Sequence, residues 1–308
     1  MTACARRWLR KKSSPAVDLE ATSASTRLSW DAPATTVSVA GVHGGAGATT
    51  LCLLLAHAIT RFGAAPALAV DLAGRARGGL AVLGQANGQT TAEATALLTA
   101  ADDGCPSEPF GVNDAGVRIV GTHPDGVDEF DRDCETLVRQ LVEAVDRGAD
   151  DARLGGVVRV ALREAECRRA VRWDNDELSE CIGALLDQAF LHHALVAIDL
   201  GIVDSEPLAR AVGVRTDLHV WAVPGRVHSL EIAERRLPLS SFETAGREAI
   251  AVWPESDAAL SATRLSGLGD LRGCPVVRVG NHGGECLTWD ERLLRCLSGV
   301  EELCELAR

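Results

Sequence analysis

Short apolar runs and longer stretches of helical periodicity alternate along the first part of the chain. Residues 36–42 form an apolar run of β type, and after the glycines that follow, residues 51–62 carry apolar side chains at helical spacing. Residues 67–71 are a second short apolar run, which ends in an acid. Strand, helix and strand in this order predict a βαβ unit, and hence a parallel sheet with helices on both faces.

The same alternation continues to the end of the chain. Further strands are predicted at residues 117–121, 195–199, 218–223, 249–253 and 275–279. Further helices are predicted at residues 90–98, 134–145, 178–190 and 293–304. The periodicity leaves residues 156–162 undecided between strand and helix, and residues 260–269 are an uncertain connection between strands. The fold class is therefore α/β, a mostly parallel sheet flanked by helices.

Length and composition indicate one main domain. The 308 residues, 46% of them apolar and 24% charged, are sufficient for a large core. Residues 1–33 are polar, small and basic, and are expected to form a disordered tail. The domain then spans residues 34–308, with a weaker pattern from about residue 241 onward.

Charge and hydropathy limit the partners. A net charge of −12 disfavours nucleic acid and anionic lipid as partners. No apolar stretch reaches membrane-spanning or signal-peptide length, so we expect a cytoplasmic protein without a membrane segment. The predicted last helix has glutamates on its polar face, which favours docking on the protein itself over insertion at a membrane surface.

A glycine-rich loop joins the first predicted strand to the first predicted helix. Backbone N–H groups converge at such a junction, and the helix dipole favours an anion there. Glycines let the backbone wrap closely around a phosphate, and a threonine hydroxyl in the loop is suited to Mg²⁺. The candidate nucleotide-binding residues are Gly44, Gly45, Ala46, Gly47, Ala48, Thr49 and Thr50. A tight turn without a ligand is the alternative.

With His43 in front of it, this loop resembles the deviant Walker A motif of the ParA/MinD family of P-loop ATPases, Lys-Gly-Gly-x-Gly-Lys-Thr-Thr. The run from Ala69 to Ala73 is similar to the family strand that ends in Asp-x-Asp, and Asp199 matches the family's Walker B acid. The strand and helix after residue 217 are also similar. The resemblance covers residues 35–240 and implies a P-loop NTPase-like fold with ATP and Mg²⁺ as ligands.

Three of the family's functional side chains are missing. His43 and Ala48 stand where the family has its two lysines, of which the first reaches the partner's nucleotide in a dimer. Ala73 replaces the second acid of Asp-x-Asp, which helps to position the attacking water in the family. Loss of the phosphate-binding lysine typically removes about 4–7 kcal/mol of transition-state stabilisation. We therefore expect feeble or no ATP hydrolysis and assign no catalytic residue.

Binding is a separate question from hydrolysis. The loop amides, the Thr49 hydroxyl and the carboxylates of Asp199 and Asp71 remain as candidate groups for nucleotide and Mg²⁺. Each acid has an equally plausible role as the cap of the turn after its strand. Arg75 and Arg77 are candidates to replace the lost positive charge, although exposed loop arginines seldom do so.

The sequence thus predicts a degenerate ParA/MinD-like nucleotide-binding protein. A pseudo-ATPase acting as a switch or scaffold in partitioning, cell-pole positioning, secretion or conjugation fits these residues best. A protein-interaction scaffold that binds no nucleotide and a weakly active ATPase are the alternatives. The resemblance implies a homodimer through the loop face, and a further protein partner is expected.

Overall fold

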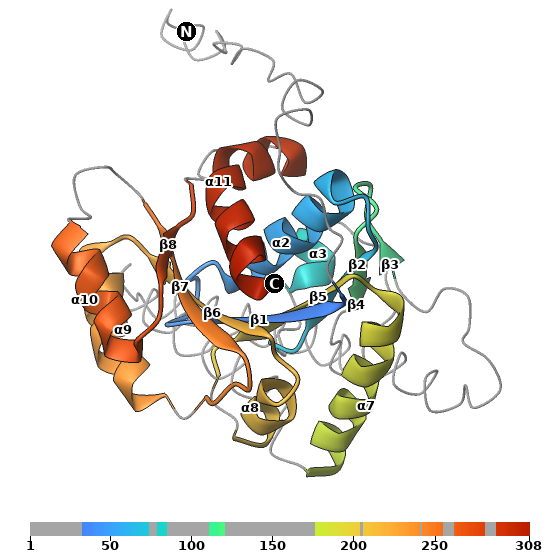
Figure 1. Cartoon of the computed structure of the whole chain (residues 1–308), viewed down its shortest axis with the longest axis horizontal. Coiled ribbons are helices and arrows are strands. Elements are labelled where there is room, and N and C mark those ends of the chain that lie inside the picture. Colours follow the sequence, from blue (N-terminus) through green and yellow to red (C-terminus); the bar gives the residue numbers. More distant parts are fainter. Residues whose placement is uncertain are drawn as a thin grey trace, which may run out of the picture.

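The computed structural model of the chain has a central sheet between two layers of helices (Figure 1). The structure describes residues 33–73, 79–84, 111–120, 176–203, 206–240, 242–254, 262–280 and 288–308. The tail before residue 33, the helices predicted at residues 90–98 and 134–145, and the undecided residues 156–162 lie outside these ranges.

The described residues form an eight-stranded sheet in the order β3-β4-β2-β5-β1-β6-β7-β8. All neighbouring strands are parallel except β3 and β4, which are antiparallel. The strands are β1 (Thr35–Gly41), β2 (Ala67–Asp71), β3 (Gly111–Val112), β4 (Arg118–Val120), β5 (Leu195–Gly201), β6 (Leu218–Pro224), β7 (Arg247–Trp253) and β8 (Val276–Arg278). The mostly parallel sheet expected from the sequence is confirmed.

Helices cover both faces of the sheet (Figure 1). One face packs against α2 (Ala48–Phe62), α3 (Leu80–Leu83) and α11 (Trp289–Ala307). The opposite face packs against α7 (Asp176–His192), α8 (Glu206–Gly213), α9 (Val227–Arg236), the 3₁₀ turn η1 (Leu237–Leu239) and α10 (Ala262–Arg272). The sheet therefore separates two hydrophobic cores.

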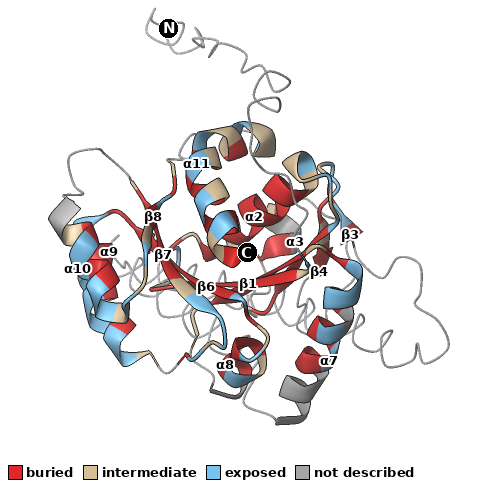
Figure 2. Ribbon diagram, in the orientation of Figure 1, coloured by how far each residue is buried: buried red, intermediate tan, exposed pale blue. Residues whose placement is uncertain are grey.

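The strands are buried because both of their faces carry small or branched apolar side chains. Every residue of β1, β2, β5 and β6 is buried, whereas the helices keep an exposed side (Figure 2). Continuous apolar runs are typical of parallel strands that are covered on both faces. This burial fixes the positions of the loops at the carboxyl ends of the strands.

The C-terminal helix α11 docks on the protein, as its amphipathic pattern predicts. Thr288 caps the helix in a capping box with Glu291, and the apolar face is buried against α2 and the sheet. The His57 Nε2 atom of α2 lies 2.8 Å from Asp290 Oδ1, which ties the two helices together. None of the described helices is long and apolar enough to cross a membrane.

Helix α10 resolves a region that the sequence pattern left undecided. It spans Ala262–Arg272 and contains Gly267 and Gly269, which lower helix propensity. Leu265 and Leu268 are buried against the sheet and anchor it. Because α10 buries so few apolar side chains, its sequence lacks the apolar stripe by which an amphipathic helix is usually recognised.

Candidate functional site

The glycine-rich loop lies at the carboxyl end of β1, in the middle of the sheet. It leaves β1 at Gly41 and enters α2 at Ala48, with Gly47 as the N-cap residue. Gly45 and Gly47 have φ angles of 81° and 91°, in the left-handed region that favours glycine. The loop therefore has a backbone that other residues would adopt only with strain.

Backbone N–H groups at the start of α2 have no acceptor among the described residues. The Ala46 amide donates to the His43 carbonyl at 3.1 Å, and the first helical bond runs from Leu51 N to the Gly47 carbonyl at 2.9 Å. The amides of residues 47–50 make no such bond in the described part of the chain, and no side chain caps the helix. Unpaired donors at the positive end of a helix dipole suit an anion such as a phosphate.

Asp71 and Asp199 lie side by side at the same edge of the sheet. They are paired in register between β2 and β5, and they are 2% and 0% exposed. Both Asp71 oxygens accept backbone amides, Oδ1 from Ala73 at 3.0 Å and Oδ2 from Leu80 at 2.8 Å. Asp199 Oδ1 accepts the Gly201 amide at 2.9 Å. Asp71 therefore caps the turn after β2, the role that the sequence left open beside metal binding, and Asp199 holds the backbone at the last residue of β5.

Cys52 adjoins these acids and was not singled out by the sequence. It lies in the first turns of α2, three residues after Thr49, and is fully buried. Burial raises the pKa of its thiol well above the usual range, and the charges of Asp199 and Asp71 raise this pKa further. The thiol therefore stays protonated and acts as a small core side chain.

The residues at the positions of the missing lysine and acid are small and packed. Ala48 is 6% exposed and belongs to the core on the α2 face. Ala73 lies against Gly201, such that a β-carbon built on Gly201 would be 2.8 Å from the Ala73 Cβ. Neither side chain carries a charge or a hydrogen-bonding group. Arg75 and Arg77 lie outside the described residues.

His43 is turned toward its own chain. Its Nε2 atom lies 2.8 Å from the Ser229 hydroxyl in α9, and its Nδ1 atom lies 2.9 Å from the Gly44 carbonyl. Arg236, the last residue of α9, donates from Nη1 to the Val42 carbonyl at 3.0 Å. Sequence reasoning missed Ser229 and Arg236 as partners of the loop, because both are distant in the chain and the resemblance around Ser229 gave it no contact with the loop.

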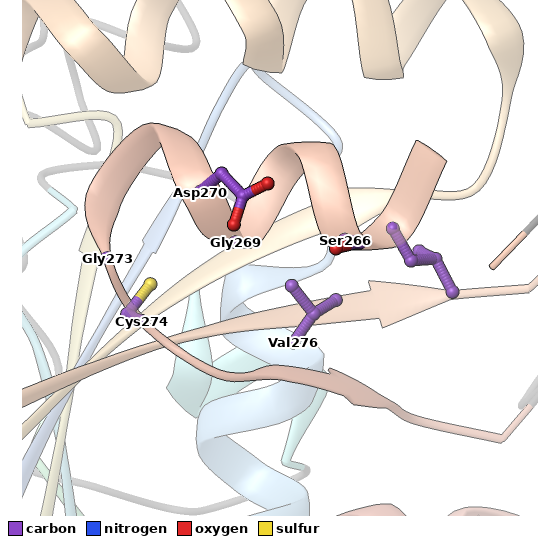
Figure 3. Close-up of a pocket in the computed structure, with 7 residues that line it drawn as sticks. Ser266, Gly269, Asp270, Gly273, Cys274 and Val276 are labelled. Atoms are coloured by element: carbon purple, nitrogen blue, oxygen red, sulfur yellow. The ribbon is translucent and has the colours of Figure 1, made fainter. Parts of the chain in front are cut away.

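A separate hollow of about 560 Å³ lies between α10 and β8, at the edge of the sheet (Figure 3). Among the described residues that line it, Asp270 is the one with a charged side chain. Burial is the main cause that raises the pKa of the Cys274 thiol to about 11, so this sulfur is not a ready nucleophile. We assign no chemistry to this hollow. Its lining is Leu265, Ser266, Gly269, Asp270, Gly273, Cys274 and Val276.

Comparison with known proteins agrees with this geometry at the level of the fold. No known family profile matches the sequence, and no curated protein sequence matches it either. Among solved structures, a ParA family ATPase from Chlorobium tepidum TLS is similar, with 12% identity, a TM-score of 0.53, and coverage of 89% of this chain and 96% of that chain.

Two further structures show the same likeness. A chain of the MinC:MinD cell division protein complex of Aquifex aeolicus is 13% identical, with a TM-score of 0.55 over 89% of this chain and 95% of that chain. The McdA–ATP complex from Cyanothece gives 12% identity and a TM-score of 0.52 over 89% of this chain and 98% of that chain. The chain therefore has the α/β P-loop fold of the ParA and MinD ATPases.

Proposed function

We propose that the chain is a ParA/MinD-like nucleotide-binding protein that holds Mg-ATP in its glycine-rich loop with little or no hydrolysis. The observation that carries the proposal is the loop itself. The loop can hold a phosphate because Gly45 and Gly47 have positive φ angles and the amides at the start of α2 are unpaired. Position 48, by contrast, is a buried alanine that brings no positive charge.

Thr49 is the first residue to test as a Mg²⁺ ligand. It lies in the first turn of α2 and is half-buried, and Asp71 and Asp199 lie at the same edge of the sheet. Oxygen donors of this kind suit Mg²⁺ bound between phosphates. Backbone amides already bind both carboxylates. We therefore propose that Asp71 and Asp199 help to form the surroundings of the Mg²⁺ ion while they continue to hold the backbone.

In the cell, such a protein would act as a switch or scaffold whose nucleotide state changes its partners. We propose a role in positioning or partitioning, with a homodimer through the loop face and a further protein partner. Similarity to a MinC:MinD cell division protein complex supports the protein partner. We also propose that the protein acts in the cytoplasm.

The test is calorimetric titration with Mg-ATP on the wild-type chain and two glycine variants. Gly45→Asp places a carboxylate in the loop, where a new β-carbon meets no atom within 4 Å. Gly273→Asp is the matched control, because Gly273 also has a positive φ, 64°, and open space around it, but lies at the end of α10. Aspartate tolerates this conformation better than most residues, so both variants should fold.

We expect saturable binding to the wild type and to Gly273→Asp, and none to Gly45→Asp. Phosphate release from ATP should stay at background. If the wild type does not bind Mg-ATP, the alternative of a scaffold that binds no nucleotide is favoured. Steady release of phosphate would instead favour the alternative of a weakly active ATPase.

A further inference from the structure

The contact between His43 and Ser229 gives residue 43 a partner within its own chain. The Gly44 carbonyl can only accept a hydrogen bond, so the His43 Nδ1 atom carries a proton in this arrangement. In the neutral ring, Nε2 then accepts the hydroxyl proton of Ser229. Both ring nitrogens are thus engaged without any second copy of the chain.

Helix α9 holds the entrance of the loop at two places. Ser229 in its first turn contacts the His43 side chain, and Arg236 at its last residue binds the Val42 carbonyl at 3.0 Å. Ser229 is 3% exposed, so its hydroxyl is oriented by packing. The Val42 amide is itself bound to the Ala222 carbonyl of β6 at 3.2 Å. The entrance of the loop is therefore fixed to β6 and to α9.

The turn of the loop depends on this entrance. The His43 carbonyl accepts the Ala46 amide, which closes the turn just before Gly47 and the unpaired amides of α2. A shift of His43 would move that carbonyl and open the turn. His43 therefore links two contacts: its ring binds Ser229, and its carbonyl closes the turn that shapes the anion-binding backbone.

We propose that Ser229 is a positioning residue of the phosphate loop, which acts by holding His43 in place within the same chain. This inference rests on the proposed function. It adds that the side chain at position 43 has its hydrogen-bond partners within its own chain.

The experiment measures Mg-ATP affinity in Ser229→Ala, Ser229→Thr, His43→Ala and the Ser229→Ala/His43→Ala double variant. Ser229→Ala should weaken binding about five- to tenfold, the effect of losing one hydrogen bond. Ser229→Thr keeps the hydroxyl and should restore affinity. The double variant should bind no worse than His43→Ala alone, because both changes remove the same contact. Ser266→Ala, in α10, is the control and should bind as the wild type does.

A second measurement keeps the inference separate from the proposed function. Hydrogen exchange of the Ala46 amide in the nucleotide-free protein should quicken in Ser229→Ala and in His43→Ala, and not in Ser266→Ala. If the wild type binds no nucleotide but this exchange quickens, the proposed function fails and the positioning role stands. Unchanged exchange at Ala46, or unchanged affinity in Ser229→Ala where the wild type binds, overturns the inference.

Discussion

The indole of Trp253 lies directly against Gly47, so that a β-carbon built on Gly47 would stand 2.8 Å from the Trp253 Nε1 atom. Trp253 ends β7 and is 6% exposed. The N-cap of α2 is thus confined by its own positive φ and by an aromatic ring from a strand about 200 residues further along the sequence.

Two loop glycines should respond differently to alanine for this reason. Gly47→Ala meets both the backbone strain and the Trp253 ring, and should cost about 2–4 kcal/mol of unfolding free energy. Gly45→Ala meets only the strain, because its surroundings are open, and should cost about 1 kcal/mol. Urea unfolding of both variants measures the difference. Equal losses would show that Trp253 does not confine the loop.

Stability should fall as the pH falls below about 6.5, and His219 should be the main cause. Its ring is fully buried, stacked on Phe242 and bonded to the Ser38 hydroxyl at 2.7 Å. Burial lowers the pKa of His219 from 6.5 to about 3, with the charge of Arg272 as a second cause. The unfolded chain therefore binds a proton near pH 6.5 that the folded chain does not bind. Each pH unit below this lowers the free energy of unfolding by up to about 1.4 kcal/mol until the folded pKa is reached.

Urea midpoints at pH 7.5, 6.5 and 5.5 test this dependence. His219→Leu should flatten most of it, since leucine does not titrate and the Ser38 hydroxyl keeps the Thr216 hydroxyl, at 3.3 Å, as a hydrogen-bond partner. A smaller slope should remain from His57 and His193, because burial lowers the pKa of each. If stability depends on pH as steeply in His219→Leu as in the wild type, His219 is not the main cause of the pH dependence.

Arg272 should contribute far more to stability than an exposed arginine nearby. It binds Glu248 through two hydrogen bonds, of 2.6 and 2.9 Å, and lies over the Trp221 ring at 5.8 Å. Arg272→Ala should cost about 2–4 kcal/mol, because it leaves Glu248 without these partners in a site where both side chains are less than 20% exposed. Lysine cannot reproduce the two-pronged contact, so Arg272→Lys should recover only part of the loss.

The control for Arg272 is Arg264→Ala. Arg264 pairs with Glu234 at 3.2 Å on a more exposed part of the surface. Its loss should cost less than about 1 kcal/mol. Denaturant unfolding of the three variants gives the comparison, and a similar cost for Arg264→Ala and Arg272→Ala would argue against the central role of Arg272.

Ala48→Lys should strengthen nucleotide binding without creating an efficient ATPase. A lysine at the first residue of α2 would bring a charged donor to the loop, and such a hydrogen bond typically contributes about 1.5–3 kcal/mol, or about 10- to 100-fold in affinity. Turnover should stay low because Ala73 offers no group to position water. Ala48→Met, which has a stem without charge, separates the charge from the added bulk. Equal affinities of the lysine and methionine variants would show that the charge does not reach the ligand.

The sheet could be predicted from the sequence because its strands are short, continuous apolar runs. Residues 195–199 and 218–223 were found as β5 and β6 for this reason. The adjacency of Asp71 and Asp199 also follows from parallel strands that end at one edge. The loop was recognisable because its chemistry is local, with glycines directly before a helix.

The remainder of the site was hidden because it depends on contacts between distant segments. Ser229 is 186 residues from His43, and the sequence around it has no feature that marks a loop partner. Trp253 presents the same difficulty, since an aromatic residue at a strand end is more often simple core. Helix α10 was undecided because its glycines and few buried residues weaken the periodic signal.

The place of β1 in the middle of the sheet has a consequence for the order in which the protein assembles. Its neighbours are β5 and β6, and the Thr36 amide binds the Asp217 carboxylate across 181 residues of sequence. Contacts of such long range close late and slow the folding reaction. As the chain emerges from the ribosome, the glycine-rich loop is made early, but the two strands that flank β1 are complete only when residues 201 and 224 have followed. The loop should therefore acquire its shape in one of the last steps of folding.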